Sequence, residues 1–153
     1  MDSYTVKQLD EMEAIFHGSF RRAGAELGVE SFGLQVFDMP AGAGHYPEHD
    51  HSHDGQEEVY VILSDSGEFE IDGERVPVDP ERIIRISAAA KRKLIPGPHG
   101  VRVLALGGMP GKIYERPEPF RLGAADPTGT AWQLLEDRSR HSDRGIGLLP
   151  RET

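Results

Sequence analysis

Apolar and polar residues alternate in a series of short segments through the middle of the chain. Successive side chains of a strand point to opposite faces, so this alternation is typical of strands with one buried face. The segments are 31–39, 58–63, 68–72, 74–78, 82–86, 91–95 and 101–106. Turn residues separate them at intervals of roughly ten residues. The pattern therefore predicts an all-β sandwich or barrel.

Glycine, proline and aspartate predict the turns between these strands. Asp72 and Gly73 form the strongest hairpin signal, because both residues tolerate the positive φ that a two-residue turn requires. Further turns are expected at 40–44, 64–67 and 96–100, where glycine and proline gather.

Both ends of the chain depart from the strand pattern. Apolar residues in 6–17 have a spacing close to helical, which predicts a short N-terminal helix or turn. Beyond the last strand the chain is rich in proline and glycine as far as Pro127, and then offers a short helix candidate at 130–137. The charged tail that follows is expected to be flexible. We therefore expect an N-terminal segment, 1–30, packed on a barrel, 31–108, with an extension, 109–153.

Composition excludes several classes of function. A chain of 153 residues is most naturally one domain. Its net charge of -9 is spread along the sequence, which argues against nucleic-acid and anionic-membrane partners. The chain has no cysteine, so any metal site must use nitrogen and oxygen ligands. The sequence shows neither a signal peptide nor a run of about 18 apolar residues, and a cytoplasmic location is expected.

Three histidines precede the second predicted strand. His49, His51 and His53 alternate with other residues, and the strand begins with Glu58. On an extended chain the three imidazoles point the same way. Imidazoles and a carboxylate that converge on one point suit a divalent transition metal such as Zn, Mn, Fe or Ni.

These residues resemble the first sequence motif of the cupin family. His51-x-His53, followed after four residues by Glu58, matches the centre of that motif, although Asp65 stands where the family has a glycine. The resemblance covers about 32–108. It implies a double-stranded β-helix, or jelly-roll barrel, a homodimer formed through barrel edges, and a small-molecule ligand or substrate. Dioxygenase, isomerase or epimerase, and lyase chemistry are all implied, as is ligand binding without turnover.

The second cupin motif is degenerate, and Arg92 stands where the family has its last histidine ligand. A guanidinium cannot coordinate a cation. If Arg92 points inward, the barrel could be a metal-free binding or sensing module in which Arg92 pairs with Glu58 or anchors a carboxylate or phosphate. Alternatively, the metal is kept with His49 in place of the missing ligand, or Arg92 lies on a solvated outer face.

The sequence leaves the choice of histidine pair open. His51 and His53 have the family's spacing and are preferred, with His49 as a substitute or fourth ligand; the candidate ligands are thus His49, His51, His53 and Glu58. If the protein is an enzyme, Tyr60 on the inward face of the strand is a candidate for moving protons.

Overall fold

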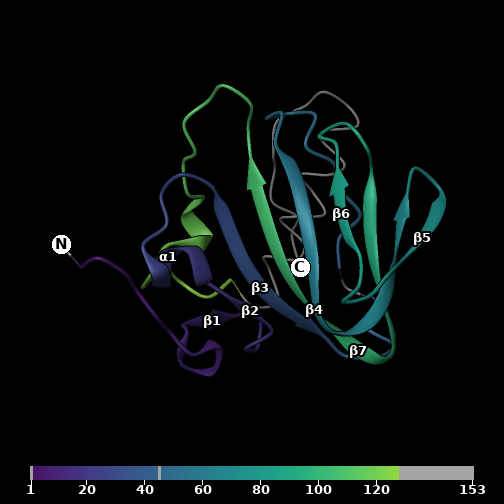
Figure 1. The fold of residues 1–153 in the computed structure, drawn as a ribbon, viewed down its shortest axis with the longest axis horizontal. Coiled ribbons are helices and arrows are strands. Elements are labelled where there is room, and N and C mark those ends of the chain that lie inside the picture. Colours follow the sequence, from purple (N-terminus) through teal and green to yellow (C-terminus); the bar gives the residue numbers. More distant parts are fainter. Residues whose placement is uncertain (1, 45, 128–153) are drawn as a thin grey trace.

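Seven strands of the computed structural model, which describes residues 2–44 and 46–127, pair into one antiparallel sheet (Figure 1). They are β1 (Ala14–Ile15), β2 (Phe20–Arg21), β3 (Gly33–Met39), β4 (Glu57–Ile71), β5 (Glu74–Val78), β6 (Ile83–Ile86) and β7 (Arg92–Gly108). The order is β1-β2-β3-β7-β4-β5, and β6 pairs with β4 beside this path. The sheet curls around a buried core, which confirms the predicted all-β barrel.

The hairpin predicted at Asp72 and Gly73 is present. Both residues have positive φ, 48° and 85°. Ile71 at the end of β4 pairs with Glu74 at the start of β5. The turn therefore sets the register of this pair, as the sequence predicted.

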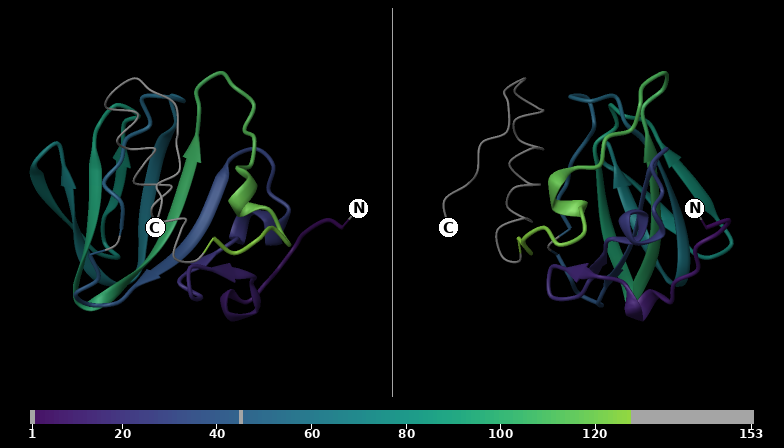
Figure 2. Two further views of the ribbon diagram at one scale, coloured as in Figure 1. Left: turned by 180° about the vertical axis from the view of Figure 1, so that it is seen from behind. Right: turned by 90° about the vertical axis from the view of Figure 1, so that its left-hand side faces the viewer.

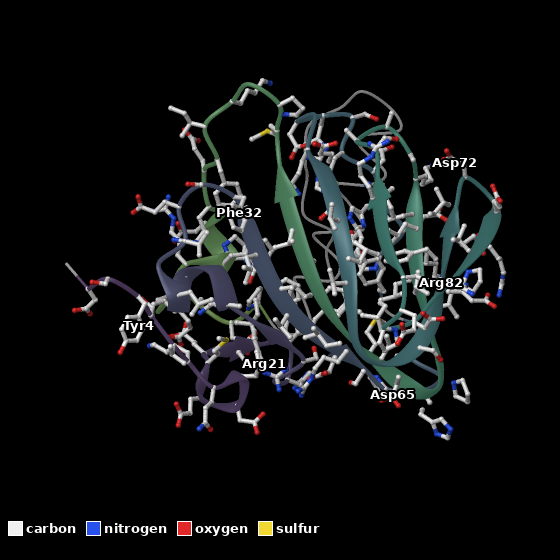
Figure 3. The ribbon with its side chains drawn as sticks, in the orientation of Figure 1. Tyr4, Arg21, Phe32, Asp65, Asp72 and Arg82 are labelled. Atoms are coloured by element: carbon white, nitrogen blue, oxygen red, sulfur yellow. The ribbon has the colours of Figure 1, made fainter. Side chains whose placement is uncertain are left out.

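Two predicted turns are wrong, because β4 and β7 are long strands that run through them. The expected turn at 64–67 is a pair of irregularities within β4, where the register with β7 shifts between Ile62 and Ser64 and again between Asp65 and Gly67. Asp65 has a φ of 63°, and it lies at the lower end of the barrel in Figure 3, away from the hairpin at Asp72. The expected turn at 96–100 lies within β7. Bulges bend a strand without ending it, so these residues curve the sheet.

For 6–17 the sequence predicted a short helix or a turn, and the structure has the turn. A 3-10 turn spans Leu9–Glu11, and β1 follows it. The α-helix of the described N-terminal segment is α1 (Ala23–Leu27), where the sequence indicated no element. Gly24 packs α1 against β3 so closely that a Cβ atom there would lie 2.9 Å from the Leu34 carbonyl oxygen.

The first part of the extension packs on the N-terminal segment (Figure 2). Arg22 is buried and donates from Nε to the Pro119 carbonyl oxygen at 2.9 Å. A 3-10 helix, Glu118–Phe120, brings the Phe120 ring to 5.2 Å from the Phe20 ring. The helix candidate at 130–137 and the charged tail lie outside the described residues. Within the described ranges, no helix is long and apolar enough to cross a membrane.

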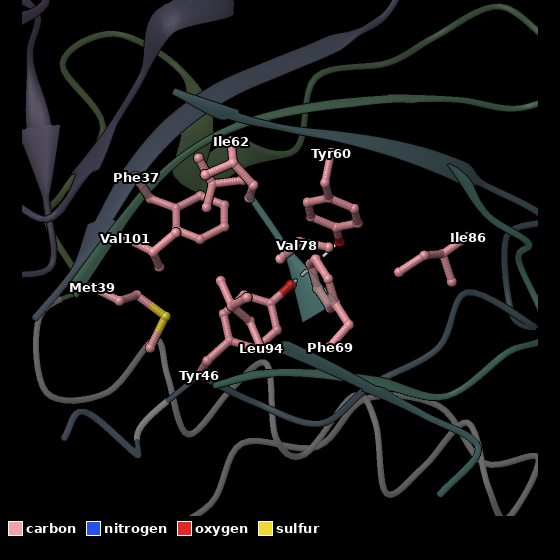
Figure 4. Packing of buried hydrophobic residues seen from close by; sticks show 11 residues of the cluster. Phe37, Met39, Tyr46, Tyr60, Ile62, Phe69, Val78, Ile86, Leu94 and Val101 are labelled. Atoms are coloured by element: carbon pink, nitrogen blue, oxygen red, sulfur yellow. Dashed lines mark hydrogen bonds between the residues drawn. The ribbon is translucent and has the colours of Figure 1, made fainter. Parts of the chain in front are cut away.

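The core fills much of the barrel interior (Figure 4). Its fully buried members come mainly from β4 and β7, which pair along most of their lengths. Tyr60, Phe69, Leu94 and Val103 are among them. The site described next lies between this core and the loop that leads into β4.

Candidate metal centre

His49 is fixed to the barrel by its backbone. Its N–H donates to the Arg92 carbonyl oxygen at 3.0 Å, and its carbonyl accepts the Arg92 N–H at 2.9 Å. This isolated bridge continues the ladder at the start of β7. The imidazole of His49 consequently projects from a defined position into the barrel mouth.

The chain turns directly after His51. The N–H of Gly55 donates to the His51 carbonyl oxygen at 2.8 Å, and the Asp50 carboxylate accepts the Ser52 N–H at 3.0 Å. The prediction that three histidines point the same way assumed an extended chain. Because the chain turns after His51, His53 does not continue the alternation of His49 and His51. The favoured pairing of His51 with His53 beside Glu58 is therefore not what the structure has, because His49 takes the place that His53 was expected to occupy.

The structure forms two groups with the same composition, two imidazoles and one carboxylate. We call His49, His51 and Glu58 the inner cluster, and His51, His53 and Asp54 the outer cluster. In each, one ligand atom per residue lies within 4.8 Å of the others, so that both are candidate sites for a cation.

The inner cluster converges on one oxygen atom. Glu58 Oε1 lies 3.7 Å from His49 Nε2 and 3.2 Å from His51 Nε2. The exposed fraction of the Glu58 side chain is 12%, so this carboxylate is largely shielded from water. Two nitrogens and an oxygen leave further coordination positions for water or substrate, as catalytic metal sites do.

Both imidazoles are oriented through their other nitrogen. His49 Nδ1 lies 2.9 Å from the Pro47 carbonyl oxygen, so the hydrogen bond requires the proton on Nδ1. His51 Nδ1 lies 3.2 Å from an oxygen of Asp54. Metal-bound histidines usually donate this second N–H to a carbonyl or a carboxylate, which leaves Nε2 as the ligand. The chemistry and orientation of these side chains thus fit a divalent metal at the inner cluster.

Opposite charges dominate the electrostatics around His51 when no metal is bound. Burial lowers the pKa of His51, but hydrogen bonds to Asp54 and Glu58 outweigh it and raise this pKa to about 9. Burial raises the pKa of Asp54, yet the His51 bond and the backbone N–H of Gln56 bring it down to about 2. For Glu58, burial is likewise outweighed by the hydrogen bonds of His49 and His51, which hold its pKa well below the usual range. Glu58 is therefore an anion ready to bind a cation.

Two tyrosines extend the polar network behind Glu58. Tyr60 donates its hydroxyl proton to Glu58 Oε1 at 2.7 Å, and the hydroxyls of Tyr46 and Tyr60 lie 3.3 Å apart (Figure 4). Burial and the nearby Glu58 charge raise the pKa of both phenols, so both stay protonated. The inward position predicted for Tyr60 is confirmed by its burial.

Arg92 is fully buried, with an exposed side-chain fraction of 0%, so the alternative of a solvated outer face is wrong. Its Nη2 donates to the Ser87 carbonyl oxygen at 3.0 Å, and its Nη1 lies 3.9 Å from Glu58 Oε1. Nε and Nη1 make no hydrogen bond to the described part of the chain. Arg92 thus compensates the charge of Glu58 from within the barrel, at a position where the family has a metal ligand.

A cavity of about 150 Å³ adjoins the inner cluster. His49, His51 and Glu58 contribute to its lining, whereas Arg92 does not. Phe120 and Tyr114, from the extension, form part of its wall. No sequence pattern pointed to these two residues, since their positions depend on contacts across the fold, or to Asp54, whose contact with His51 depends on the local turn.

Comparisons with solved structures find the same architecture in proteins of low sequence identity. A cupin protein from Bacteroides fragilis aligns with a TM-score of 0.59 and 23% identity, over 76% of this chain and 93% of its own. A sugar phosphate isomerase from a cupin superfamily, from Silicibacter pomeroyi, aligns with a TM-score of 0.56 and 16% identity, over 67% and 74%. No protein-family model matches the sequence, and neither does any curated protein.

Proposed function

We propose that this chain, which has the cupin fold, binds a divalent transition metal through His49, His51 and Glu58 and uses it to bind or convert a small organic molecule. One observation carries the proposal. Both imidazoles are held through Nδ1 while Nε2 faces the same carboxylate oxygen, an orientation that serves a shared cation.

The ligand set proposed here leaves out His53. Its side chain has an exposed fraction of 35%, and its Nε2 lies 3.5 Å from a carboxylate oxygen of Asp54. Nitrogen and oxygen ligands in this number suit Zn, Mn, Fe or Ni.

A bound metal would act as a Lewis acid on an oxygen atom of the ligand. The chain's own residues then have separate tasks. Glu58 and the two histidines hold the cation, and Asp54 keeps the His51 ring in position. Tyr60 is a neutral phenol beside the carboxylate, which makes it the proposed residue for holding a proton near the reacting atoms.

The alternative is a metal-free binding module with Arg92 as the anchor for an anion. Its support is the full burial of Arg92 beside Glu58, with Nε and Nη1 free of hydrogen bonds to the described residues. A ligand in the cavity would have to reach Arg92 past Glu58, however, and a carboxylate repels an anion. The geometry therefore favours metal binding, with Arg92 compensating the charge of Glu58.

Metal analysis of protein purified without a His-tag tests the proposal. The protein is stripped of metal, reloaded separately with Zn, Mn, Fe or Ni, and the affinity is measured by calorimetry. We expect close to one metal per chain for at least one ion. His49→Ala and His51→Ala should each weaken binding by about 100-fold or more, because each removes a ligand.

The matched control is His99→Ala, which removes an exposed imidazole far along the chain from the cluster. It should bind metal like the wild type. A wild type that takes up none of the four ions would refute the proposal, and so would an equal loss of affinity in His99→Ala.

The expected homodimer and the cytoplasmic location stay predictions. Within the described residues, β1 and β5 end the strand order of the sheet and leave edges on which a second copy could pair. Light scattering coupled to size exclusion would give the mass in solution.

A further inference from the structure

Four of the aromatic rings that line the cavity form a series in which each ring stacks on the next. Phe20 stacks on Phe37 with a centroid distance of 5.8 Å and an interplanar angle of 8°. On one side Phe120 stacks on Phe20 at 5.2 Å and 22°, and on the other Tyr46 stacks on Phe37 at 5.8 Å and 28°. The series begins with Phe120 in the extension and ends with Tyr46, whose ring lies 5.7 Å from the ring of His49. This row of rings makes part of the cavity lining apolar and leads to the inner cluster.

The volume of the cavity limits its occupant. At about 150 Å³ it matches the size of an engineered apolar cavity that binds benzene. A single planar ring with one or two small substituents fills such a space. A larger, flexible molecule would have to extend into solvent and would leave the aromatic wall uncovered.

The charges around the cavity limit the occupant further. Its lining includes three carboxylates, Asp50, Asp54 and Glu58, and among the described residues it contains no lysine or arginine. A phosphate group carries close to two negative charges and is normally bound by arginine, lysine or a helix N-terminus. Among the residues that the structure describes, a metal bound by the neutral histidines would supply the positive charge that faces the ligand, enough for one anionic or neutral oxygen.

We infer that the ligand of this site is a small molecule built on one planar ring, uncharged apart from a metal-binding oxygen, and that phosphorylated compounds are excluded. This inference rests on the proposed function, in that the oxygen would face the metal at His49, His51 and Glu58. It separates this site from any that acts on a sugar phosphate, despite the shared fold with the Silicibacter protein.

The extension takes part in this selection. Phe120 and Tyr114 follow the last barrel strand, and both contribute to the lining of the cavity. The Tyr114 ring also lies close to Gly33, where a Cβ atom would come to 3.2 Å from it. Specificity therefore depends on how the N-terminal segment and Arg22 hold the extension in place.

Binding of phenol and of glucose 6-phosphate to the zinc-loaded full chain tests the inference. Binding is followed by two-dimensional NMR through the amide signals of Gly33 and Gly107, which line the cavity. We expect phenol to bind at least about tenfold more tightly than glucose 6-phosphate. Ala105→Leu, which adds apolar volume at a residue that lines the cavity, should weaken phenol binding about tenfold. Ala41→Leu, at an exposed position outside the cavity, should leave it unchanged.

A second variant keeps the test decisive if Ala105→Leu fails to fold. Phe120→Leu removes one ring of the wall from outside the barrel and should weaken phenol binding about three- to tenfold. Tighter binding of glucose 6-phosphate than of phenol would overturn the inference. Phenol binding that neither folded variant weakens would overturn it as well.

Failure of the metal proposal gives a different result. The wild type could take up no metal while phenol still binds the metal-free chain and Ala105→Leu weakens this binding. The inference of an aromatic ligand would then be supported, and the metal proposal alone would be refuted. If metal binds as proposed but phenol does not, the ligand class is wrong and the metal centre stands.

Discussion

The inner and outer clusters contain the same kinds of side chain, yet they differ in how far they are shielded from water and in how their rings are oriented. Each has two imidazoles and a carboxylate, and the two share His51. Glu58 of the inner cluster has an exposed side-chain fraction of 12%, whereas Asp54 and His53 of the outer cluster have 31% and 35%. Water competes for the outer groups and screens their charges.

The two clusters also differ in what their hydrogen bonds leave available. In the inner cluster both histidines use Nδ1 for a fixed acceptor and keep Nε2 for Glu58. In the outer cluster Asp54 already accepts from His51 Nδ1 and from the Gln56 backbone N–H at 3.0 Å. Asp54 therefore acts on the inner cluster, by holding His51, more than it forms a site of its own. Residue composition alone does not separate the two, but burial and the second hydrogen bond of each ring do.

The two clusters should differ most in the free energy of unfolding that is lost when the carboxylate of each, Glu58 or Asp54, is replaced by an amide. Glu58→Gln keeps the shape of the side chain but leaves the buried Arg92 guanidinium beside an uncharged amide. We expect the metal-free protein to lose about 3–5 kcal/mol in its free energy of unfolding. Asp54→Asn should cost about 1 kcal/mol, since the side chain is partly exposed and an amide oxygen can still accept from Gln56.

Urea unfolding of both variants, measured without metal and at neutral pH, makes this comparison directly. Equal losses in the two variants would mean that the inner carboxylate is no more important to the fold than the outer one. That result would contradict the conclusion that Glu58 and Arg92 compensate each other's charge.

His51, which both clusters share, should make the stability of the metal-free protein depend on pH. The pKa of His51 is raised from 6.5 to about 9 in the folded state. Its stabilising contribution is therefore fully present below pH 6.5 and lost as the pH rises toward 9. The loss should be of the order of 3 kcal/mol in the free energy of unfolding. Asp54, with a lowered pKa of about 2, contributes above pH 4 and loses its contribution as the pH falls toward 2.

Unfolding midpoints between pH 6 and 9.5 would reveal the His51 contribution, with His51→Gln as the control that should flatten the curve. Asp54→Asn and Glu58→Gln should each make stability depend less on pH, because each removes a carboxylate that raises the pKa of His51. The two reductions compare the contributions of the outer and the inner carboxylate. A wild type whose stability stays level across this range would contradict the raised pKa.

The sequence was sufficient for those parts of the fold that depend on local patterns. The strand alternation and the hairpin at Asp72 and Gly73 need only neighbouring residues, and both were predicted correctly. The turn expected at 64–67 was wrong because Asp65 accepts a positive φ within a bulge, so the same residues bend β4 without ending it. The helix α1 has five residues, too few for a helical period to show, and its position depends on the contact of Gly24 with Leu34.

The candidate site was predictable in its residue types but not in its partners. The spacing indicated two histidines and Glu58, and it could not distinguish His49 from His53. That choice depends on the turn at His51–Gly55, whose hydrogen bonds are not encoded in an alternating pattern. The position of Arg92 was also open, because a register shift of one residue exchanges the inner and outer faces of a strand. Its burial follows from its pairing with Ile71 and its bridge to His49.

The smallest effect should come from His53, and this prediction decides between the two histidine pairs. His53→Ala removes a side chain that is 35% exposed and whose ring packs 5.7 Å from that of His51. We expect a change within about 0.5 kcal/mol in the free energy of unfolding, as for other surface positions. Metal affinity should stay within about threefold of the wild type, whereas His49→Ala loses about 100-fold. Calorimetry on the two single variants, prepared side by side, gives both numbers. If His53→Ala loses its metal and His49→Ala keeps it, the inner cluster is not the metal site and the histidine ligands are His51 and His53, the pair with the family's spacing.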